Sequence, residues 1–257
     1  MEGKLPAYIA RRLVSMLPSL IILSILVFLF IHLIPGDPAA ILLGDLASPD
    51  QISKLRNELG LDRPLYVQYF LWIGKILRGD FGQSIFLSQA VTTVIAGRLE
   101  TSLFIAVLSF LLVLMIGIPI GIISAVKYNS KIDQFFSGIA MFFASIPSFW
   151  LGLNLMTIFA VGLKWLPSSG FPSVLETGNV ANLRYLILPC LALAAPNSAL
   201  IIRLTRASML DVFKEDYVRT ARAKGLSLLR VTIAHVFRNS LVGIVAALGF
   251  TFVSLLA

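Results

Sequence analysis

Five long apolar stretches that contain no Asp, Glu, Lys or Arg constrain the fold of this chain more than any other feature. They run from Leu13 to Ile34, Ser102 to Val126, Phe135 to Val161, Tyr185 to Ile202 and Ser240 to Ala257. A bilayer core about 30 Å thick is crossed by roughly 20 apolar residues in a helix, because each backbone group must find its hydrogen bond within the segment. Only 13% of the residues are charged, against about 25% in soluble domains. The sequence therefore predicts an all-α polytopic transmembrane helix bundle with five spans.

The first stretch has the basic start of a signal peptide, since Arg11 and Arg12 precede it. Its length of 22 residues exceeds a signal core of roughly 7 to 15 residues, and no A-x-A cleavage site follows it. We therefore predict a first span that stays in the protein.

The distribution of basic residues predicts the orientation. With the N-terminus in the cytoplasm, the inner segments 1–12, 127–134 and 203–239 hold 13 Lys and Arg in 57 positions, whereas the outer segments 35–101 and 162–184 hold 8 in 90. Cytoplasmic loops carry an excess of Lys and Arg, so this orientation is favoured. The net charge of +8 has the same origin, and we expect no nucleic-acid partner.

The outer loop 35–101 is predicted to contain short helices. Ser48 and Gln51 form a capping-box pattern, Pro49 is at the first helical position, and Gly60 is placed to end the helix. A second helix, Tyr66 to Leu77, is rich in aromatic residues, as expected at a membrane interface. Packing is favoured over ligand binding for this aromatic stripe, and a docking surface for an external partner is the alternative.

Small residues and prolines mark the interior of the spans. Gly117 and Gly121 permit a close helix approach. Pro119, Pro147, Pro189 and Pro196 each lack a backbone donor and are expected to kink helices. Kinked helices are compatible with a translocation path, and they also occur in packed bundles. The candidate path residues are Pro147, Ser148, Asn154, Pro196 and Asn197. For Asn154, a structural hydrogen bond to a neighbouring helix is the default role.

Sequence motifs for catalysis, metals and cofactors are absent. The chain has no G-x-x-x-x-G-K-[ST], no H-E-x-x-H and a single cysteine, Cys190. His32 lies near the outer end of the first stretch, where an interfacial role is favoured over proton relay. We predict no catalytic residue, no metal site and no cofactor, so the energy for any transport must come from another chain or from a solute gradient.

The inner loop 203–239 is predicted to form a helix, a glycine elbow and a second helix. Arg203 and Arg206 are expected to extend toward lipid headgroups. Met209, Phe213, Tyr217 and Ala221 recur every four residues, which predicts one continuous helix; Gly225 is placed to close it and Ser227 to cap the next helix. Periodicity alone favours an interfacial amphipathic helix over a docking element.

Several motifs, spread in order along nearly the whole chain, resemble those of a known family. The segment Glu215–Leu226 reads EDYVRTARAKGL, and further matches are YIARRLVSMLPSL at 8–20, HLIPGDPA at 32–39, LRNELGLDRPLYVQY at 55–69, SIPSFWLG at 145–152 and RLTRASML at 203–210. These segments are similar to permease subunits of ATP-binding cassette importers, in the branch that transports peptides and nickel.

The resemblance implies a fold, a location and partners. It implies a type I importer permease fold, one transmembrane permease domain over residues 1–257, in a bacterial inner membrane. The implied partners are a second homologous permease, two cytoplasmic ATPases, an external solute-binding protein and membrane lipid. Short peptides are the implied substrates, with nickel and glutathione as alternatives.

The resemblance also implies a role for the loop 203–239. Its short helix would enter a groove on the ATPase with a small face around Ala221 and Ala223, at an angle set by Gly225, and would couple ATPase closure to alternating access. The implied coupling residues are Glu215, Asp216, Tyr217, Arg219, Thr220, Ala221, Ala223 and Gly225.

Three departures from the family pattern accompany these matches. Arg219 and Thr220 occupy the first two places of a motif that generally begins Glu-Ala-Ala, and Gly243 stands where a proline commonly follows the motif. Family members also continue into a sixth span that this sequence lacks. The alternative prediction is therefore a truncated remnant that is inactive in transport.

Overall fold

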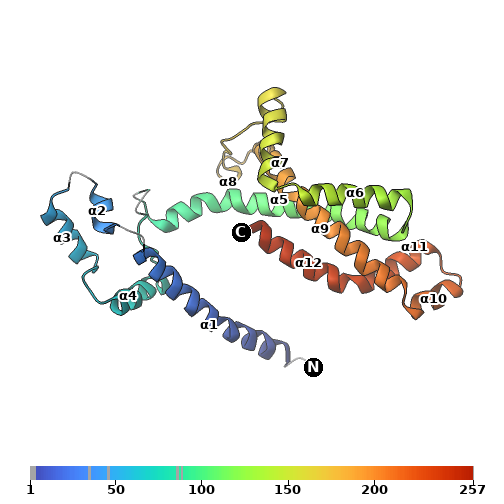
Figure 1. Ribbon diagram of the computed structural model, residues 1–257, viewed down its shortest axis with the longest axis horizontal. Helices are drawn as coiled ribbons and strands as arrows, with labels where there is room; N and C mark the ends of the chain where they lie inside the picture. Colours follow the sequence, from blue (N-terminus) through green and yellow to red (C-terminus); the bar gives the residue numbers. More distant parts are fainter. Residues whose placement is uncertain (1–3, 34–35, 45–46, 85–86, 88, 257) are drawn as a thin grey trace. The chain divides into compact units, whose positions relative to one another are not determined.

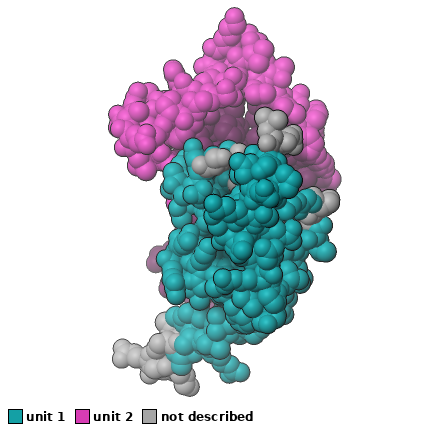
Figure 2. Space-filling model, turned by 90° about the vertical axis from the view of Figure 1, so that its left-hand side faces the viewer, with its two compact units in different colours: residues 1–97 teal, residues 98–257 magenta. Residues whose placement is uncertain are grey.

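The computed structural model describes residues 4–33, 36–44, 47–84, 87 and 89–256. The predicted segment bounds Met1, Ile34, Pro35 and Ala257 lie outside these residues. All regular elements of the described part are helices, apart from one isolated bridge between Gln83 and Ala90, so the all-α prediction is confirmed. The chain divides into two compact units, residues 1–97 and 98–257 (Figure 2).

Unit 1 begins with a long apolar helix and continues with three short ones. These are α1 (Lys4–Leu33), α2 (Pro38–Leu43), α3 (Pro49–Glu58) and α4 (Leu65–Leu77). Both halves of the predicted capping box form: the Ser48 hydroxyl accepts from the Gln51 amide at 3.3 Å, and the Ser48 amide donates to the Gln51 side chain at 2.9 Å. Gly60 follows α3 with φ +71°. The sequence therefore predicted α3 with both of its ends.

Helix α4 is attached to α1 by aromatic packing and by polar contacts. The rings of Tyr69 and Trp72 lie 5.4 and 5.8 Å from that of Phe28, which is buried on α1. The Tyr69 hydroxyl lies 2.8 Å from the Ser24 hydroxyl, and Gln68 Oε1 lies 3.2 Å from His32 Nε2. One side of the aromatic helix is thus used for packing, as predicted.

Unit 2 contains most of α5 (Val91–Val126) and all later elements (Figure 1). They are α6 (Lys131–Ser145), α7 (Ser148–Leu155), the π-helix η1 (Met156–Gly162), α8 (Val174–Thr177), the 3-10 helix η2 (Val180–Leu186), α9 (Ile187–Phe213), α10 (Asp216–Ala223), α11 (Leu228–Arg230), the π-helix η3 (Val231–Phe237) and α12 (Arg238–Leu256). Helix α9 is central, because it packs against α6, α7 and α12.

Four helical segments of the described chain are long and apolar enough to cross a membrane: Ala7–Phe30, Val91–Val126, Val180–Phe213 and Leu228–Leu256. The predicted third span, Phe135 to Val161, is instead two helices bent by 95°. The break coincides with a proline, which disfavours the helical conformation in the residue before it. Ile146 is accordingly extended, with φ −92° and ψ 126°, ahead of Pro147. The predicted single kinked helix is therefore wrong. The described chain has five candidate membrane spans only if this bent pair crosses the membrane as one span.

The predicted close approach at Gly117 and Gly121 is confirmed. A Cβ atom on Gly117 would lie 2.8 Å from Ile201 Cγ2, and one on Gly121 would lie 2.6 Å from Thr205 Cβ. Ile201 is fully buried and belongs to a hydrophobic cluster with Val113 of α5 and Ala194 of α9. Glycine is therefore required for α5 and α9 to pack at this distance.

Candidate functional site

In the charged loop 203–239, the helix that contains Met209 ends earlier than the sequence pattern predicts. Helix α9 ends at Phe213, Glu215 is extended with φ −66° and ψ 142°, and α10 begins at Asp216. The prediction of one continuous helix from Met209 to Ala221 is therefore wrong. A spacing of four residues fits two consecutive helices as well as one, so periodicity does not reveal a break between them.

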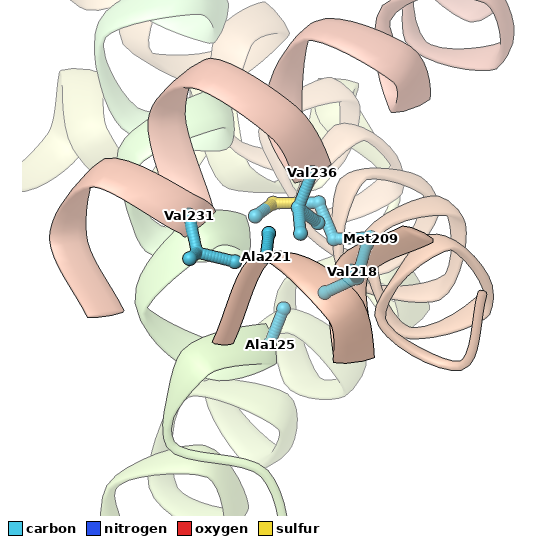
Figure 3. Packing of buried hydrophobic residues seen from close by; sticks show 6 residues of the cluster. All are labelled: Ala125, Met209, Val218, Ala221, Val231 and Val236. Atoms are coloured by element: carbon cyan, nitrogen blue, oxygen red, sulfur yellow. The ribbon is translucent and has the colours of Figure 1, made fainter. Parts of the chain in front are cut away.

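The break allows α10 to fold back onto the end of α9. Six buried residues form a cluster here that we call the α10 core (Figure 3). It consists of Ala125 from α5, Met209 from α9, Val218 and Ala221 from α10, and Val231 and Val236 from η3. One face of α10 is thus fixed to the ends of three long helical segments.

The opposite face of α10 is largely exposed in the described part of the chain. Seven of the eight predicted coupling residues are exposed: Glu215, Asp216, Tyr217, Arg219, Thr220, Ala223 and Gly225. The eighth, Ala221, is only 7% exposed. A small outward face made by Ala221 and Ala223 is therefore the wrong prediction, because Ala221 packs inward against the α10 core.

Gly225 forms the predicted elbow after α10. Its φ is +84°, its amide donates to the Arg222 carbonyl at 2.9 Å, and the Leu226 amide donates to the Ala221 carbonyl at 3.4 Å. The Ser227 hydroxyl accepts from the Arg230 amide at 3.4 Å and caps α11, as predicted. The chain then continues through η3 into α12.

A second tie joins α10 to α12. Asn239 Nδ2 donates to the Tyr217 hydroxyl at 2.9 Å and to the His235 carbonyl at 2.8 Å. No spacing rule in the sequence pairs Tyr217 with Asn239, because 22 residues separate them.

Arg206 was predicted to extend toward lipid headgroups, but it forms an ion pair inside the protein instead. Its Nε and Nη2 atoms donate to Asp133 Oδ1 and Oδ2 at 2.7 and 2.8 Å. Asp133 is 2% exposed. No spacing rule in the sequence pairs Asp133 with Arg206, because 73 residues separate them.

The candidate path residues lie on α7 and α9, which pack together. Pro147 and Ser148 lie at the start of α7, and Pro196 is inside α9. Asn154 Nδ2 donates to the Trp150 carbonyl and Asn197 Nδ2 to the Leu193 carbonyl, each at 2.8 Å. Both amide nitrogens thus bind the backbone of their own helices and not a neighbouring helix, which was the contact expected of Asn154. A path along these residues stays a prediction.

A hollow of about 440 Å³ opens beside the same helices and is lined by other residues. Gly152 and Met156 contribute from α7 and η1, Thr101 from α5, and Tyr185 and Pro189 from the start of α9 and the segment before it. The described residues include no group of three or more His, Cys, Asp or Glu side chains placed to hold a metal ion.

The α10 core is expected to stabilise α10, and a substitution in it tests this. Met209→Ala removes a fully buried side chain and should cost about 2–5 kcal/mol, so α10 amides should exchange faster with deuterium. Leu229→Ala, at a site 69% exposed, is the matched control and should leave exchange unchanged. Equal exchange in the two variants would mean that α10 does not depend on this core.

Comparison with known proteins gives matches over almost the whole chain. The family described as "Binding-protein-dependent transport system inner membrane component" matches residues 117–257, and "Binding-prot-dependent transport system membrane comp, N-term" matches residues 5–106. A "Putative peptide transport system permease protein" of Brucella suis biovar 1 (strain 1330) is 39% identical over 246 residues, 96% of this chain and 78% of that protein. The glutathione transport system permease protein GsiC of Salmonella typhimurium (strain LT2) is 40% identical over 245 residues, 95% of this chain and 77% of that protein.

Proposed function

This chain belongs to the family of binding-protein-dependent transport system inner membrane components, the permease subunits of ATP-binding cassette importers, and we propose that it forms half of a translocation path for short peptides. It is a multi-pass inner membrane protein that does not itself catalyse a reaction. We propose further that α10 receives the movement of an ATPase and passes it to the spans.

One observation carries the proposed role of α10. The helix is anchored on one face in the α10 core and exposes polar residues on the other, including Arg219 and Thr220. Its anchors come from α5, α9 and η3, and η3 leads directly into α12. A short helix fixed to several spans moves them when a partner moves it, which is what a coupling element requires.

The partners follow from this arrangement. The family works with an ATPase and a binding protein. We propose two ATPases, a second homologous permease that completes the path, and contact with membrane lipid, without nucleic acid. The excess of Lys and Arg in segments 1–12, 127–134 and 203–239 favours placing the N-terminus and α10 in the cytoplasm.

The proposed substrate class rests on the relatives. One is named for peptide transport and another for glutathione transport, and glutathione is itself a short peptide. We include Pro147, Ser148, Asn154, Pro196 and Asn197 in the proposed path, because they lie on the packed helices α7 and α9.

Reconstitution tests this function directly. The permease, with a second permease and two ATPases from the same source, should take up labelled dipeptides or glutathione into proteoliposomes only when ATP and the binding protein are present. A Walker-motif variant of the ATPases is the control and should abolish uptake. Correct membrane insertion and ATPase binding without uptake of any peptide would contradict the proposal and favour a non-transporting role.

A further inference from the structure

The ion pair between Arg206 and Asp133 lies beside the α10 core but is not part of it. We propose that this pair is a mechanical joint that carries movement of α10 and the end of α9 to α6. Both are thus positioning residues for coupled transport, and in that respect the inference rests on the proposed function.

The geometry of the pair is that of a rigid, two-point contact. Arg206 bonds both carboxylate oxygens of Asp133, at 2.7 and 2.8 Å. A planar guanidinium that binds a carboxylate through two parallel hydrogen bonds fixes orientation as well as distance. The pair therefore resists both rotation and sliding of α9 against α6.

Asp133 is held on its other side by its own segment. Its Oδ2 accepts from the Asn129 amide at 2.9 Å, and its Oδ1 accepts from the Ser137 hydroxyl at 3.3 Å. The Arg206 guanidinium also lies 5.3 Å from the centre of the Tyr128 ring. The carboxylate thus connects α9 to both the turn after α5 and the first turns of α6.

Burial makes the contact expensive to break. The Asp133 side chain is 3% exposed and that of Arg206 is 27% exposed. Removal of one partner from such a pair leaves an uncompensated buried charge. By contrast, the exposed pair of Asp211 and Lys214, two turns nearer α10, is 78% and 76% exposed and adds little to rigidity.

The position of Arg206 near the end of α9 places it between α10 and α6. Arg206 and Met209 are three residues apart, so they are neighbours on the helix surface. Met209 contacts α10 through the α10 core, while Arg206 contacts α6. The last turns of α9 therefore link α10 with α6, and α6 leads to the break at Ile146 and Pro147.

A second contact between α9 and α6 is apolar. Ala140 packs against Ala199 and Ile202 farther along the two helices. Apolar packing of this kind holds the two helices together and limits their sliding, but it lacks the fixed orientation of a two-point hydrogen-bonded pair. The ion pair supplies the directional contact.

A double-mutant cycle on the full chain in lipid nanodiscs tests the joint without any ATPase. Val218→Ala loosens α10, and Arg206→Lys keeps the charge but loses the two-point contact. In the presence of Arg206, Val218→Ala should speed deuterium exchange at the start of α6, and with Arg206→Lys it should add no further change. The expected coupling is about twofold to a hundredfold in exchange rate, the range for residues that act together. Additive effects would overturn the joint.

Transport supplies the second readout. In the reconstituted importer, Arg206→Lys and Asp133→Asn should lower the peptide taken up per ATP hydrolysed by about tenfold, while ATPase binding stays intact; this factor corresponds to the loss of about 1.4 kcal/mol of coupling. Asp211→Asn is the control and should leave the ratio unchanged. An unchanged ratio in Arg206→Lys overturns the proposal. A wild-type chain without uptake would refute the proposed function instead, and the nanodisc cycle would still decide the joint.

Discussion

Gly121→Val is expected to prevent α5 and α9 from packing and to destabilise unit 2 strongly. Even the Cβ atom of the new side chain would lie 2.6 Å from Thr205 Cβ and 3.0 Å from the Ile202 carbonyl oxygen. Neither neighbour is the flexible end of a long side chain, so the backbones of the two helices must separate. Overpacking of a tight core costs about 1–3 kcal/mol, and we expect a loss at the upper end of this range. Thermal unfolding in detergent measures it.

Gly249→Val is the matched control for this prediction. Gly249 lies in α12, and a Cβ atom there would meet no atom within 4 Å in this chain. The same substitution should therefore change stability by less than about 0.5 kcal/mol, as at other open sites. A similar loss from both variants would show that glycine content, and not the contact between α5 and α9, stabilises the bundle.

The sequence predicted the features that depend on neighbours along the chain. The capping box of Ser48 and Gln51, the cap at Ser227 and the left-handed glycine at Gly225 all form as expected. Each of them needs only three or four consecutive residues. The small pair Gly117 and Gly121 also predicted a close contact, because small residues four apart allow another backbone to approach.

Features that depend on distant contacts were missed. Asp133 and Arg206 are 73 residues apart, and each alone has the pattern of a loop charge. Their pairing follows from the packing of α6 on α9, and hydropathy does not specify which helices become neighbours. Ala221 was misplaced for a related reason: its burial depends on Met209 and Val236, which reach it only because the chain turns at Glu215.

The third apolar stretch shows where hydropathy reaches its limit. Phe135 to Val161 is continuous in apolar character, so composition alone predicts one span. Pro147 disfavours a helical conformation at Ile146, and the chain turns by 95° here, whereas Pro119 and Pro196 lie inside continuous helices. A kink and a break have the same sequence pattern, since both begin with a missing donor at proline. Packing of α6 and α7 against α9 holds the larger bend.

Gly225→Pro is expected to abolish ATPase association while leaving insertion into the membrane intact. Proline fixes φ near −65°, whereas Gly225 has φ +84° and donates its amide to the Arg222 carbonyl. The elbow would have to rebuild, and α10 would lose its angle to α11 and η3. ATPase co-purification should fall by at least about tenfold, because even an ordinary L-residue pays about 1–2 kcal/mol in this conformation and proline cannot adopt it.

Gly225→Asn separates the conformation from the identity of the residue. Asparagine adopts the left-handed region more readily than other side chains, and no atom lies within 4 Å of a Cβ at this site. This variant should therefore retain most of the ATPase association. If both variants lost association equally, the exposed surface at Gly225 and not its backbone angle would make the contact. If Gly225→Pro bound the ATPase as well as the wild type, α10 would not be the docking element, because its angle would then have no effect on the partner.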